Sequence, residues 1–204
     1  MVQWNENYLA APNEKIHYTQ ATVSLHCYAR NNLVDQMQGD WLLMLDTDQT
    51  FEPDLVGRML RDMNTYNLDV LAGVYHHKQS PHPPVMYKFK KDTKNFELIS
   101  DWVVPKNHKG SIFIPIASAG AGALMVRRHV YERIRKELKE GPFDILHGRG
   151  EDHSFFMRLD KLGIKAYANP EIQTYHLKYQ ALSSEDFNRS ELPSGEFEPI
   201  GAAS

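Results

Sequence analysis

The chain has 204 residues, a length that suits one well-filled domain. Its hydrophobic residues (42%) and charged residues (24%) occur at ordinary levels for a globular protein. The formal net charge of -3 argues against a nucleic-acid-binding protein, because such proteins carry a basic excess on one face. The one cysteine, Cys27, excludes an internal disulfide and fits a reducing compartment.

The sequence shows neither a membrane span nor a signal peptide. No stretch approaches the roughly 20 apolar residues that a membrane-spanning helix needs. Residues 1–13 are polar and lack the apolar core of a signal peptide. We therefore expect a cytoplasmic protein without a transmembrane segment.

Strands and helices are expected to alternate in the first half of the chain. The apolar run Trp41–Leu45 suits a strand buried on both faces, as in the middle of an α/β sheet. Pro53 opens a helix in which Leu55, Met59 and Met63 keep helical spacing. The other elements expected here are a loosely attached arm over residues 1–20, a strand over 21–28, a helix over 31–38 and a strand over 68–75.

Strands cluster in the middle of the chain, and helices follow. Residues 79–84 read QSPHPP and are expected to form a loop. Strands are expected over residues 85–89, 96–104, 112–119 and 123–127, helices over 129–139 and from Glu151 onward, and a short strand over 171–179 after a turn at Asn169–Pro170. The pattern predicts an α/β fold with one mixed sheet flanked by helices. Its parts are an arm over 1–20, one domain over 21–180 and a tail or lid over 181–204.

Two aspartates directly follow the apolar strand. Asp46 and Asp48 flank Thr47, and ligands of open α/β sheets bind beyond the carboxyl ends of strands. Carboxylates on such a turn can share a divalent ion, because Mg²⁺ and Mn²⁺ take carboxylate oxygens together with substrate phosphates. The alternative is a surface turn whose aspartates make local backbone hydrogen bonds.

Five motifs follow one another between residues 29 and 178. Residues 29–60 contain an Ala-Arg-Asn helix start, a Gly-Asp pair before the apolar strand, the Asp-Thr-Asp turn and a proline-capped helix. The motifs LDVLAGVYHHK, SAGAGALMVRR, GEDHSFFMRLDKLG and TYHLK come later. In this order and spacing they resemble the GT-A glycosyltransferases, especially the large inverting family 2 and its short, phage-like members. The resemblance implies a GT-A-like (Rossmann-like) fold and transfer of a sugar from a nucleotide-diphosphate donor.

The resemblance also implies a metal-dependent reaction with a UDP- or GDP-sugar. A bound Mn²⁺ or Mg²⁺ acts as a Lewis acid for the charge that grows on the leaving diphosphate. By resemblance, Asp48 is the direct metal ligand, Asp46 leans toward the ribose or a metal-bound water, and His176 completes the metal site. A lone histidine is more often a hydrogen-bonded structural residue, and four others compete for this role: His76, His77, His147 and His153.

A second pair of acids, Glu151 and Asp152, stands at the start of the last predicted helix. The helix dipole favours acids in a first turn, so a capping role is one reading. An inverting transferase also needs a carboxylate that removes the proton of the attacking hydroxyl. The resemblance gives that catalytic role to Asp152, and Glu151 is a candidate contact to the acceptor. Asp152 shares helical spacing with Phe155 and Leu159, which predicts that it points inward toward the sheet edge.

Further residues are candidates for binding the substrates. Arg30 and Asn31 precede the metal-site strand, and by resemblance the arginine offsets diphosphate charge. The alternatives for these two residues are a surface salt bridge and a helix cap. Lys78 follows the next predicted strand and is another donor or acceptor contact. Gly120 and Gly122 either let the backbone approach the acceptor sugar or form a simple turn.

The start of the chain departs from the family pattern. Only 28 residues precede Ala29, and no strand and loop of the type V-S-I-I-I-P-T-Y-N occurs there. We therefore expect a nucleotide-binding part that is shortened, replaced by the arm or supplied by another subunit.

Three classes of function stay open at this point. The first is an active glycosyltransferase, for which Asp152 favours an inverting mechanism. The second is a nucleotidyltransferase-type enzyme of nucleotide-sugar chemistry, although the glycine-rich basic loop of such enzymes is missing from the start. The third is a non-catalytic sugar- or partner-binding module on the same fold. The acceptor (a glycan, lipid or protein), the donor sugar and a homo-oligomeric state are not fixed by the sequence, and no nucleic-acid partner is expected.

Overall fold

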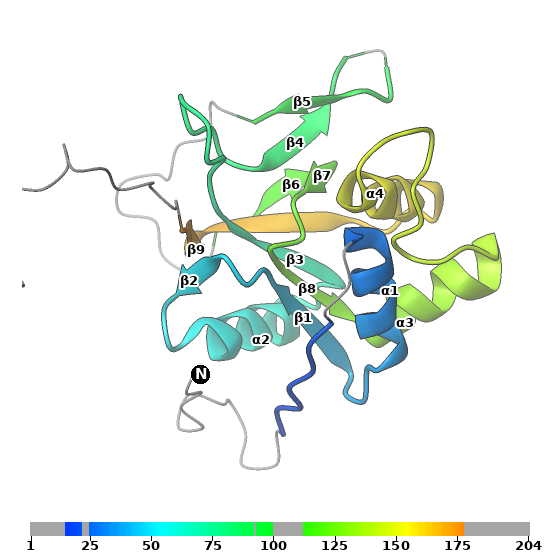
Figure 1. Ribbon diagram of the computed structural model, residues 1–204, viewed down its shortest axis with the longest axis horizontal. Helices are drawn as coiled ribbons and strands as arrows, with labels where there is room; N and C mark the ends of the chain where they lie inside the picture. The colour runs from blue at the N-terminus through cyan, green and yellow to red at the C-terminus, as the bar shows by residue number, and fades with distance from the viewer. Residues whose placement is uncertain (1–14, 22–24, 92, 100–111, 178–204) are drawn as a thin grey trace, which may run out of the picture.

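The computed structural model describes residues 15–21, 25–91, 93–99 and 112–177 (Figure 1). Most of the expected arm, the far end of the expected strand 96–104 and the whole expected tail lie outside these residues. No helix in the described ranges is long and apolar enough to cross a membrane.

The described residues form a mixed sheet of six strands and a smaller sheet of three (Figure 1). The order in the main sheet is β1 (Trp41–Leu45), β8 (Ala123–Arg127), β3 (Val70–Val74), β9 (Ala166–His176) and β2 (Gln49–Phe51), and β6 (Ile114–Ile116) also pairs with β9. β3 and β9 are parallel, and the other pairs of this sheet are antiparallel. The smaller sheet has the order β5 (Phe96–Leu98), β4 (Met86–Phe89) and β7 (Ser118–Ala119).

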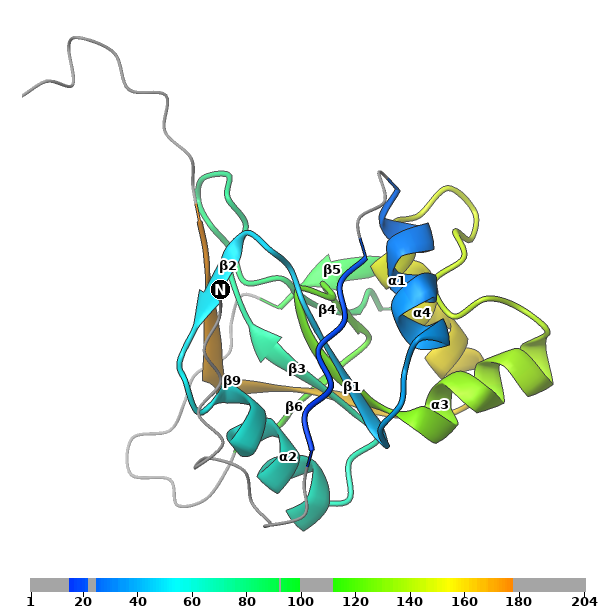
Figure 2. The same ribbon diagram turned by 60° about the horizontal axis from the view of Figure 1, so that its bottom comes forward.

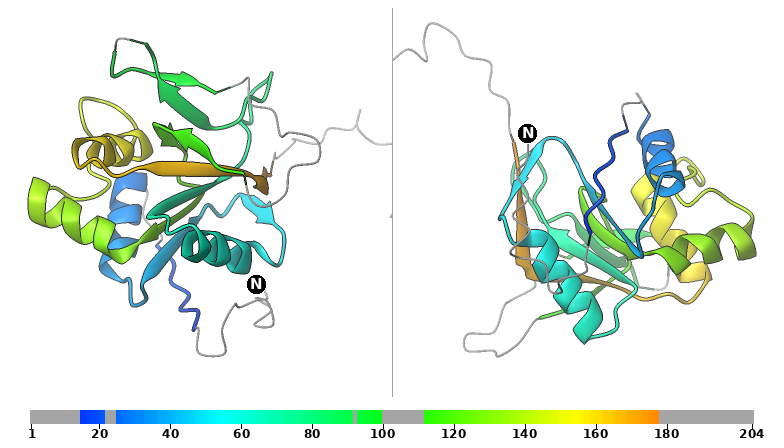
Figure 3. Two further views of the ribbon diagram at one scale, coloured as in Figure 1. Left: turned by 180° about the vertical axis from the view of Figure 1, so that it is seen from behind. Right: turned by 90° about the horizontal axis from the view of Figure 1, so that it is seen from below.

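Helices cover both faces of the main sheet (Figure 3). On one face lie α1 (His26–Asp35), α3 (Arg128–Arg133) and α4 (Glu151–Lys161), and on the other lies α2 (Leu55–Thr65). A π-helical segment, Ile134–Leu138, continues α3. The predicted α/β fold with a mixed sheet flanked by helices is therefore confirmed.

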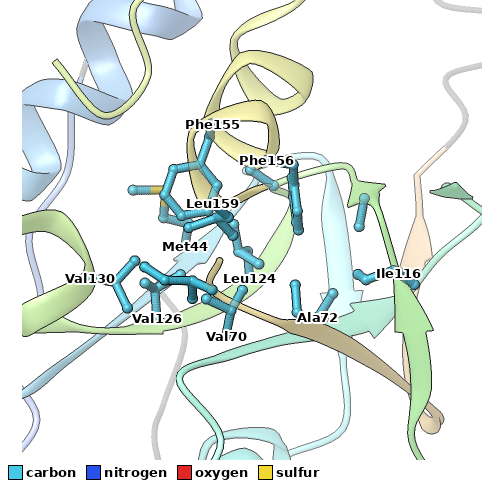
Figure 4. Close-up of a cluster of buried hydrophobic side chains, with 14 of the residues drawn as sticks. Met44, Val70, Ala72, Ile116, Leu124, Val126, Val130, Phe155, Phe156 and Leu159 are labelled. Carbon is cyan, nitrogen blue, oxygen red and sulfur yellow. The ribbon is translucent and has the colours of Figure 1, made fainter. Parts of the chain in front are cut away.

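The larger core lies between α4 and the main sheet (Figure 4). Phe155, Phe156 and Leu159 of α4 are fully buried in one cluster with Leu124 and Val126 of β8. Burying a side chain of this size contributes about 1.5–3 kcal/mol. This packing fixes the orientation of α4, whose first turn carries the second acid pair.

β1 is an outer strand, so its expected place in the middle of the sheet was wrong. It pairs with β8 on one side, and among the described residues no strand pairs with its other side. Met44 is the only fully buried residue in it. Its other apolar side chains are partly buried against the core described above and against a second hydrophobic cluster that includes residues of α2. For this reason an outer strand has the apolar composition of an inner one.

α1 begins at His26, which corrects two predictions. The strand expected over residues 21–28 is wrong at its described end, and the helix expected over 31–38 starts earlier and ends at Asp35. Asn31 is therefore interior to α1 and not its cap. Its side chain instead accepts the N–H of Phe143 (3.0 Å) and donates to Asp144 (2.8 Å), which ties α1 to the loop before α4.

The turn expected at Asn169–Pro170 was also wrong, because both residues lie within β9. The pairing of β9 with β3 jumps from Asn169 to Gln173, and Pro170 falls in this irregular stretch. A proline is tolerated there because no ladder N–H is required of it. Asn169 is buried and donates to the carboxylate of Asp62 (2.8 Å), while its Oδ1 accepts the N–H of Glu171 (2.9 Å), so the local hydrogen bond of an asparagine turn persists inside the irregular stretch of β9.

Candidate active site

The Asp46–Asp48 turn lies at the carboxyl end of β1, as predicted. The N–H of Asp46 donates to the carbonyl of Gly122 (3.1 Å), and the N–H of Gln49 donates to the carbonyl of Asp46 (3.3 Å). The turn is thus tied to the segment before β8 and leads directly into β2. Both carboxylates are partly exposed and accessible to a ligand.

A groove of about 920 Å³ leads to this turn. Residues 15–21, α1 and β1 contribute its walls, and its lining includes Asp46 and Asp48. Figure 2 and the right view of Figure 3 show residues 15–21, in dark blue, running beside β1. The volume lies within the range of pockets that bind small molecules and cofactors.

The pairing of β2 with the end of β9 brings His176 next to Asp48. Gln49 is the register partner of His176, and the N–H of Leu177 donates to the carbonyl of Asp48 (2.7 Å). The His176 Nε2 atom lies 3.9 Å from Asp48 Oδ1. Its Nδ1 lies 2.7 Å from the carbonyl of His76, and since a carbonyl only accepts, Nδ1 carries the proton. Nε2, which faces Asp48, therefore carries a lone pair when the ring is neutral and a proton when the ring is charged.

This geometry fits a divalent ion held by Asp48 and His176. A second hydrogen bond that fixes the tautomer and orientation of the imidazole is usual for a metal-binding histidine. In the described residues no three His, Cys, Asp or Glu side chains converge as a metal-binding group, so Asp46, Asp48 and His176 are not brought together as a set of three. Two protein donors are sufficient for an ion that takes its remaining ligands from water and a diphosphate.

Lys78 also contacts Asp48. The loop after β3 places Lys78 Nζ 2.5 Å from Asp48 Oδ2, while His176 faces the other carboxylate oxygen. Burial raises the pKa of Asp48, but the hydrogen bond and charge of Lys78 and the charge of His176 outweigh it, and the net pKa lies below its ordinary value. Asp48 is therefore ionised and ready to bind a cation.

Arg30 joins the two acid pairs. Its Nη2 lies 3.1 Å from Asp46 Oδ1, and its Nε lies 3.2 Å from Glu151 Oε1. Its Nη1 donates to the carbonyl of Ala121 (3.2 Å). Burial lowers the pKa of Arg30, and the charges of Asp46 and Glu151 raise it by more, so it is fully charged. The Asp46 turn and the first turn of α4 thus meet at one buried guanidinium.

Replacing Arg30 with methionine is expected to lower the free energy of unfolding by about 2–4 kcal/mol, because the largely buried Glu151 loses its closest partner and keeps only the more distant, exposed His26. Chemical denaturation measures the change. Arg135→Met, which removes an exposed ion pair with Asp35, is the matched control with little expected effect. A loss from Arg30→Met as small as that of the control would show that Arg30 does not hold the two acid pairs together.

Asp152 lies in the first turn of α4 and is half-buried, in agreement with the predicted inward direction. Its Oδ1 accepts the N–H of His153 (2.7 Å). Burial raises its pKa above the ordinary aspartate value, the charge and N–H of His153 lower it, and Glu151 raises it further. The charge of Asp152 in turn raises the pKa values of Tyr75 and Tyr87, though less than their own burial does.

The competing histidines have other partners. The His153 ring stacks on Phe96 and meets the Tyr87 ring edge-on, and its Nδ1 lies 2.7 Å from the hydroxyl of Ser118. His77 Nε2 lies 3.1 Å from the hydroxyl of Tyr87. His76 contributes its carbonyl to His176, as described above, and His147 is exposed in the loop before α4. Of the five candidates, only His176 faces a carboxylate of the Asp46–Asp48 turn.

Tyr75 is a site residue that was not singled out from the sequence. Its hydroxyl accepts the N–H of Gly122 (3.3 Å), and its ring meets the His176 ring edge-on at 4.9 Å. Burial and then the charge of Asp46 raise its pKa, so the phenol stays protonated. The sequence offered one signal that could have identified Tyr75: it directly follows an apolar strand, as Asp46 does.

Gly120 and Gly122 make close contacts within the protein. A Cβ on Gly120 would lie 1.8 Å from the Tyr75 hydroxyl, and one on Gly122 would lie 2.2 Å from Gln49 Nε2 and 2.9 Å from Asp46 Oδ2. Neither has a left-handed backbone conformation, so the requirement is for space. Because neither glycine has a side chain, the segment before β8 can lie in close contact with Tyr75, Gln49 and Asp46.

Gly120→Ala is expected to destabilise the fold by about 1–3 kcal/mol, because the rigid Tyr75 ring must move away from the new methyl group. Thermal unfolding of the two proteins measures the change. Gly39→Ala is the control, since a Cβ at position 39 would meet only the Trp41 carbonyl at 3.8 Å. Equal stability of both variants would contradict the close packing at Tyr75.

The fold and the site define an α/β protein with acidic residues gathered at the carboxyl end of a strand, as in the nucleotide-sugar-dependent transferases. Residues 2–135 match the family model described as glycosyl transferase family 2, and the chain belongs to this family. No curated protein matches the chain at a significant level. Among solved structures it is similar to A197 from STIV, with a TM-score of 0.52 and 20% sequence identity over 77% of this chain and 70% of that one. At this identity the likeness shows a shared fold.

Proposed function

We propose that the chain transfers a sugar from a UDP- or GDP-sugar to an acceptor hydroxyl, with a divalent metal ion and with inversion at the anomeric carbon. One observation carries the proposal: Arg30 contacts Asp46 and Glu151 at the same time. A turn suited to hold a donor diphosphate therefore lies next to a helix start suited to activate an acceptor. Sugar transfer needs these two functions side by side, because the reacting atoms must be held in contact.

Asp152 is the residue that we assign as the catalytic base. Its carboxylate takes the proton of the acceptor hydroxyl while that oxygen bonds to the anomeric carbon. The bond from this carbon to the diphosphate breaks on the opposite side, and the electron pair leaves with the nucleoside diphosphate. Attack and departure on opposite sides invert the configuration. Glu151, which is held by Arg30, is proposed to contact the acceptor.

The donor is proposed to lie in the groove between residues 15–21 and β1, with its diphosphate at the Asp46–Asp48 turn. Asp46 orients the ribose, and Lys78 supplies positive charge to the diphosphate. Arg30 offsets charge at the same place, and Asn31 supports it by holding the loop before α4. Asp48 and His176 would hold Mn²⁺ or Mg²⁺, which stabilises the charge of the leaving diphosphate as a Lewis acid.

A panel of nucleotide sugars tests the proposal. Each donor is incubated with the wild type in Mn²⁺, in Mg²⁺ or with a chelator, and the release of nucleoside diphosphate is followed. We expect release from one donor, dependent on the metal ion. If no donor releases its nucleotide and calorimetry detects no metal-dependent nucleotide binding, the transferase assignment is wrong.

A further inference from the structure

The two aspartates of the turn are paired with cations of different kinds. Asp46 is paired with Arg30, whose side chain is 11% exposed and also bonds to Glu151 and the carbonyl of Ala121. Asp48 is paired with Lys78, whose side chain is 38% exposed and has no other hydrogen bond or ion pair among the described residues. Arg30 is therefore fixed, whereas Lys78 is free to leave its partner.

The backbone on both sides of Lys78 is held by hydrogen bonds, while its side chain is partly exposed. The N–H of Val85 donates to the carbonyl of Tyr75 (2.8 Å), and the N–H of His77 donates to the carbonyl of Pro83 (3.0 Å). These bonds close the loop of residues 75–85 at its base. A movement of the ammonium group therefore needs only rotation about the four-carbon stem of the lysine.

Lys78 and a divalent ion would both bind Asp48. Lys78 Nζ is 2.5 Å from Oδ2, and an ion bound to Oδ1 and His176 Nε2 would bring two further positive charges close to that ammonium group. Like charges at such separations repel strongly even near a protein surface. A diphosphate bound beside the ion offers the ammonium group a new anionic partner.

We propose that Lys78 is an exchangeable cation: it neutralises Asp48 in the empty site and moves to the donor diphosphate when metal and donor bind. The inference rests on the proposed function and adds to it that the metal ion and the donor bind cooperatively. Lys78 weakens the binding of a metal ion alone and strengthens the binding of a nucleoside diphosphate once the metal is present. The site therefore fills with metal and nucleotide together rather than with metal alone.

Binding measurements on the intact chain test this exchange without any turnover. Mn²⁺ alone is titrated into the wild type and Lys78→Met while free Mn²⁺ is followed by electron paramagnetic resonance. UDP and GDP are then each titrated by calorimetry at saturating Mn²⁺. Lys78→Met is expected to bind Mn²⁺ about tenfold more tightly and the nucleotide about tenfold more weakly. The reason is that the variant lacks one positive charge beside a partly exposed site.

Two control variants accompany the test. Lys78→Arg keeps the charge and is expected to bind Mn²⁺ as the wild type does. Lys88→Met removes a lysine that pairs with Glu97 on the β4–β5 hairpin and is expected to change neither affinity. Unchanged or weaker Mn²⁺ binding by Lys78→Met would overturn the exchange, even if nucleotide binding falls. Absence of Mn²⁺ binding by both the wild type and Lys78→Met, with no Mn²⁺-dependent nucleotide binding by either, would show instead that the metal site of the proposed function is wrong, and the exchange would fall with it.

Discussion

Asp152→Asn is expected to lower the rate of sugar transfer about a thousandfold, because a general base typically contributes a factor of this order. Asparagine has nearly the same shape but cannot accept the proton of the acceptor hydroxyl. The backbone N–H of His153 can still be accepted by the amide oxygen, so α4 keeps its first turn. Metal-dependent binding of the nucleoside diphosphate should stay within about twofold of the wild type, since the base acts on the acceptor. Steady-state kinetics and calorimetry measure both quantities.

The pH dependence of kcat/KM is a second test of Asp152 as the catalytic base. Asp152 must be ionised to act as a base, so the rate falls as pH drops through its pKa. Burial raises that pKa, so the fall begins at a higher pH than the ordinary aspartate value of about 3.9 implies. Asp160→Asn, which changes an exposed aspartate of the same helix, should keep the full rate and the same pH profile. If Asp152→Asn keeps the wild-type rate, another group is the base.

Asp48→Asn is expected to weaken metal-dependent nucleotide binding about a hundredfold and to lower nucleotide release in proportion. A neutral amide is a poorer ligand for a hard divalent ion than a carboxylate is. The loss should be at least as large as that seen when residues supporting a metal ligand are removed, about 10- to 100-fold. Calorimetric titration of the nucleotide in Mn²⁺ and in chelator separates the metal-dependent part of binding.

Asp54→Asn is the matched control for Asp48→Asn. Asp54 precedes α2, a few residues along the chain, and is partly exposed beside Arg58. This variant should bind the nucleotide as the wild type does. Equal nucleotide affinity of Asp48→Asn and the wild type in Mn²⁺ would contradict the assignment of Asp48 as a metal ligand.

Local patterns predicted the elements that depend on local sequence. The spacing of Leu55, Met59 and Met63 predicted α2, and all three are buried. The apolar run before Asp46 predicted β1, but its place at the side of the sheet depends on which strands pair. Pairing between strands distant in sequence leaves no local pattern, and the α1 boundary failed because asparagines interior to the helix resemble caps.

The arrangement of the site depends on contacts that no local pattern contains. Asp46 and Asp48 were predicted from their position after a strand, whereas the approach of His176 follows from the register of β2 with β9. The sequence predicted that the charge of Arg30 acts on the donor. The bond from Arg30 to Glu151 was not predicted, because the two residues are more than a hundred positions apart in the sequence. Tyr75 was missed because a tyrosine after a strand is common and its contact with Gly122 requires the folded chain.

The configuration of the released sugar tests the central claim most directly. The wild type is given the donor identified from the panel, and ¹H NMR follows the anomeric proton of the product in the first minutes, with water serving when no acceptor is known. Attack assisted by Asp152 from the side opposite the diphosphate predicts a product of inverted configuration. A product that keeps the donor configuration would contradict Asp152 as the base and the arrangement of the two acid pairs around Arg30 as an inverting site.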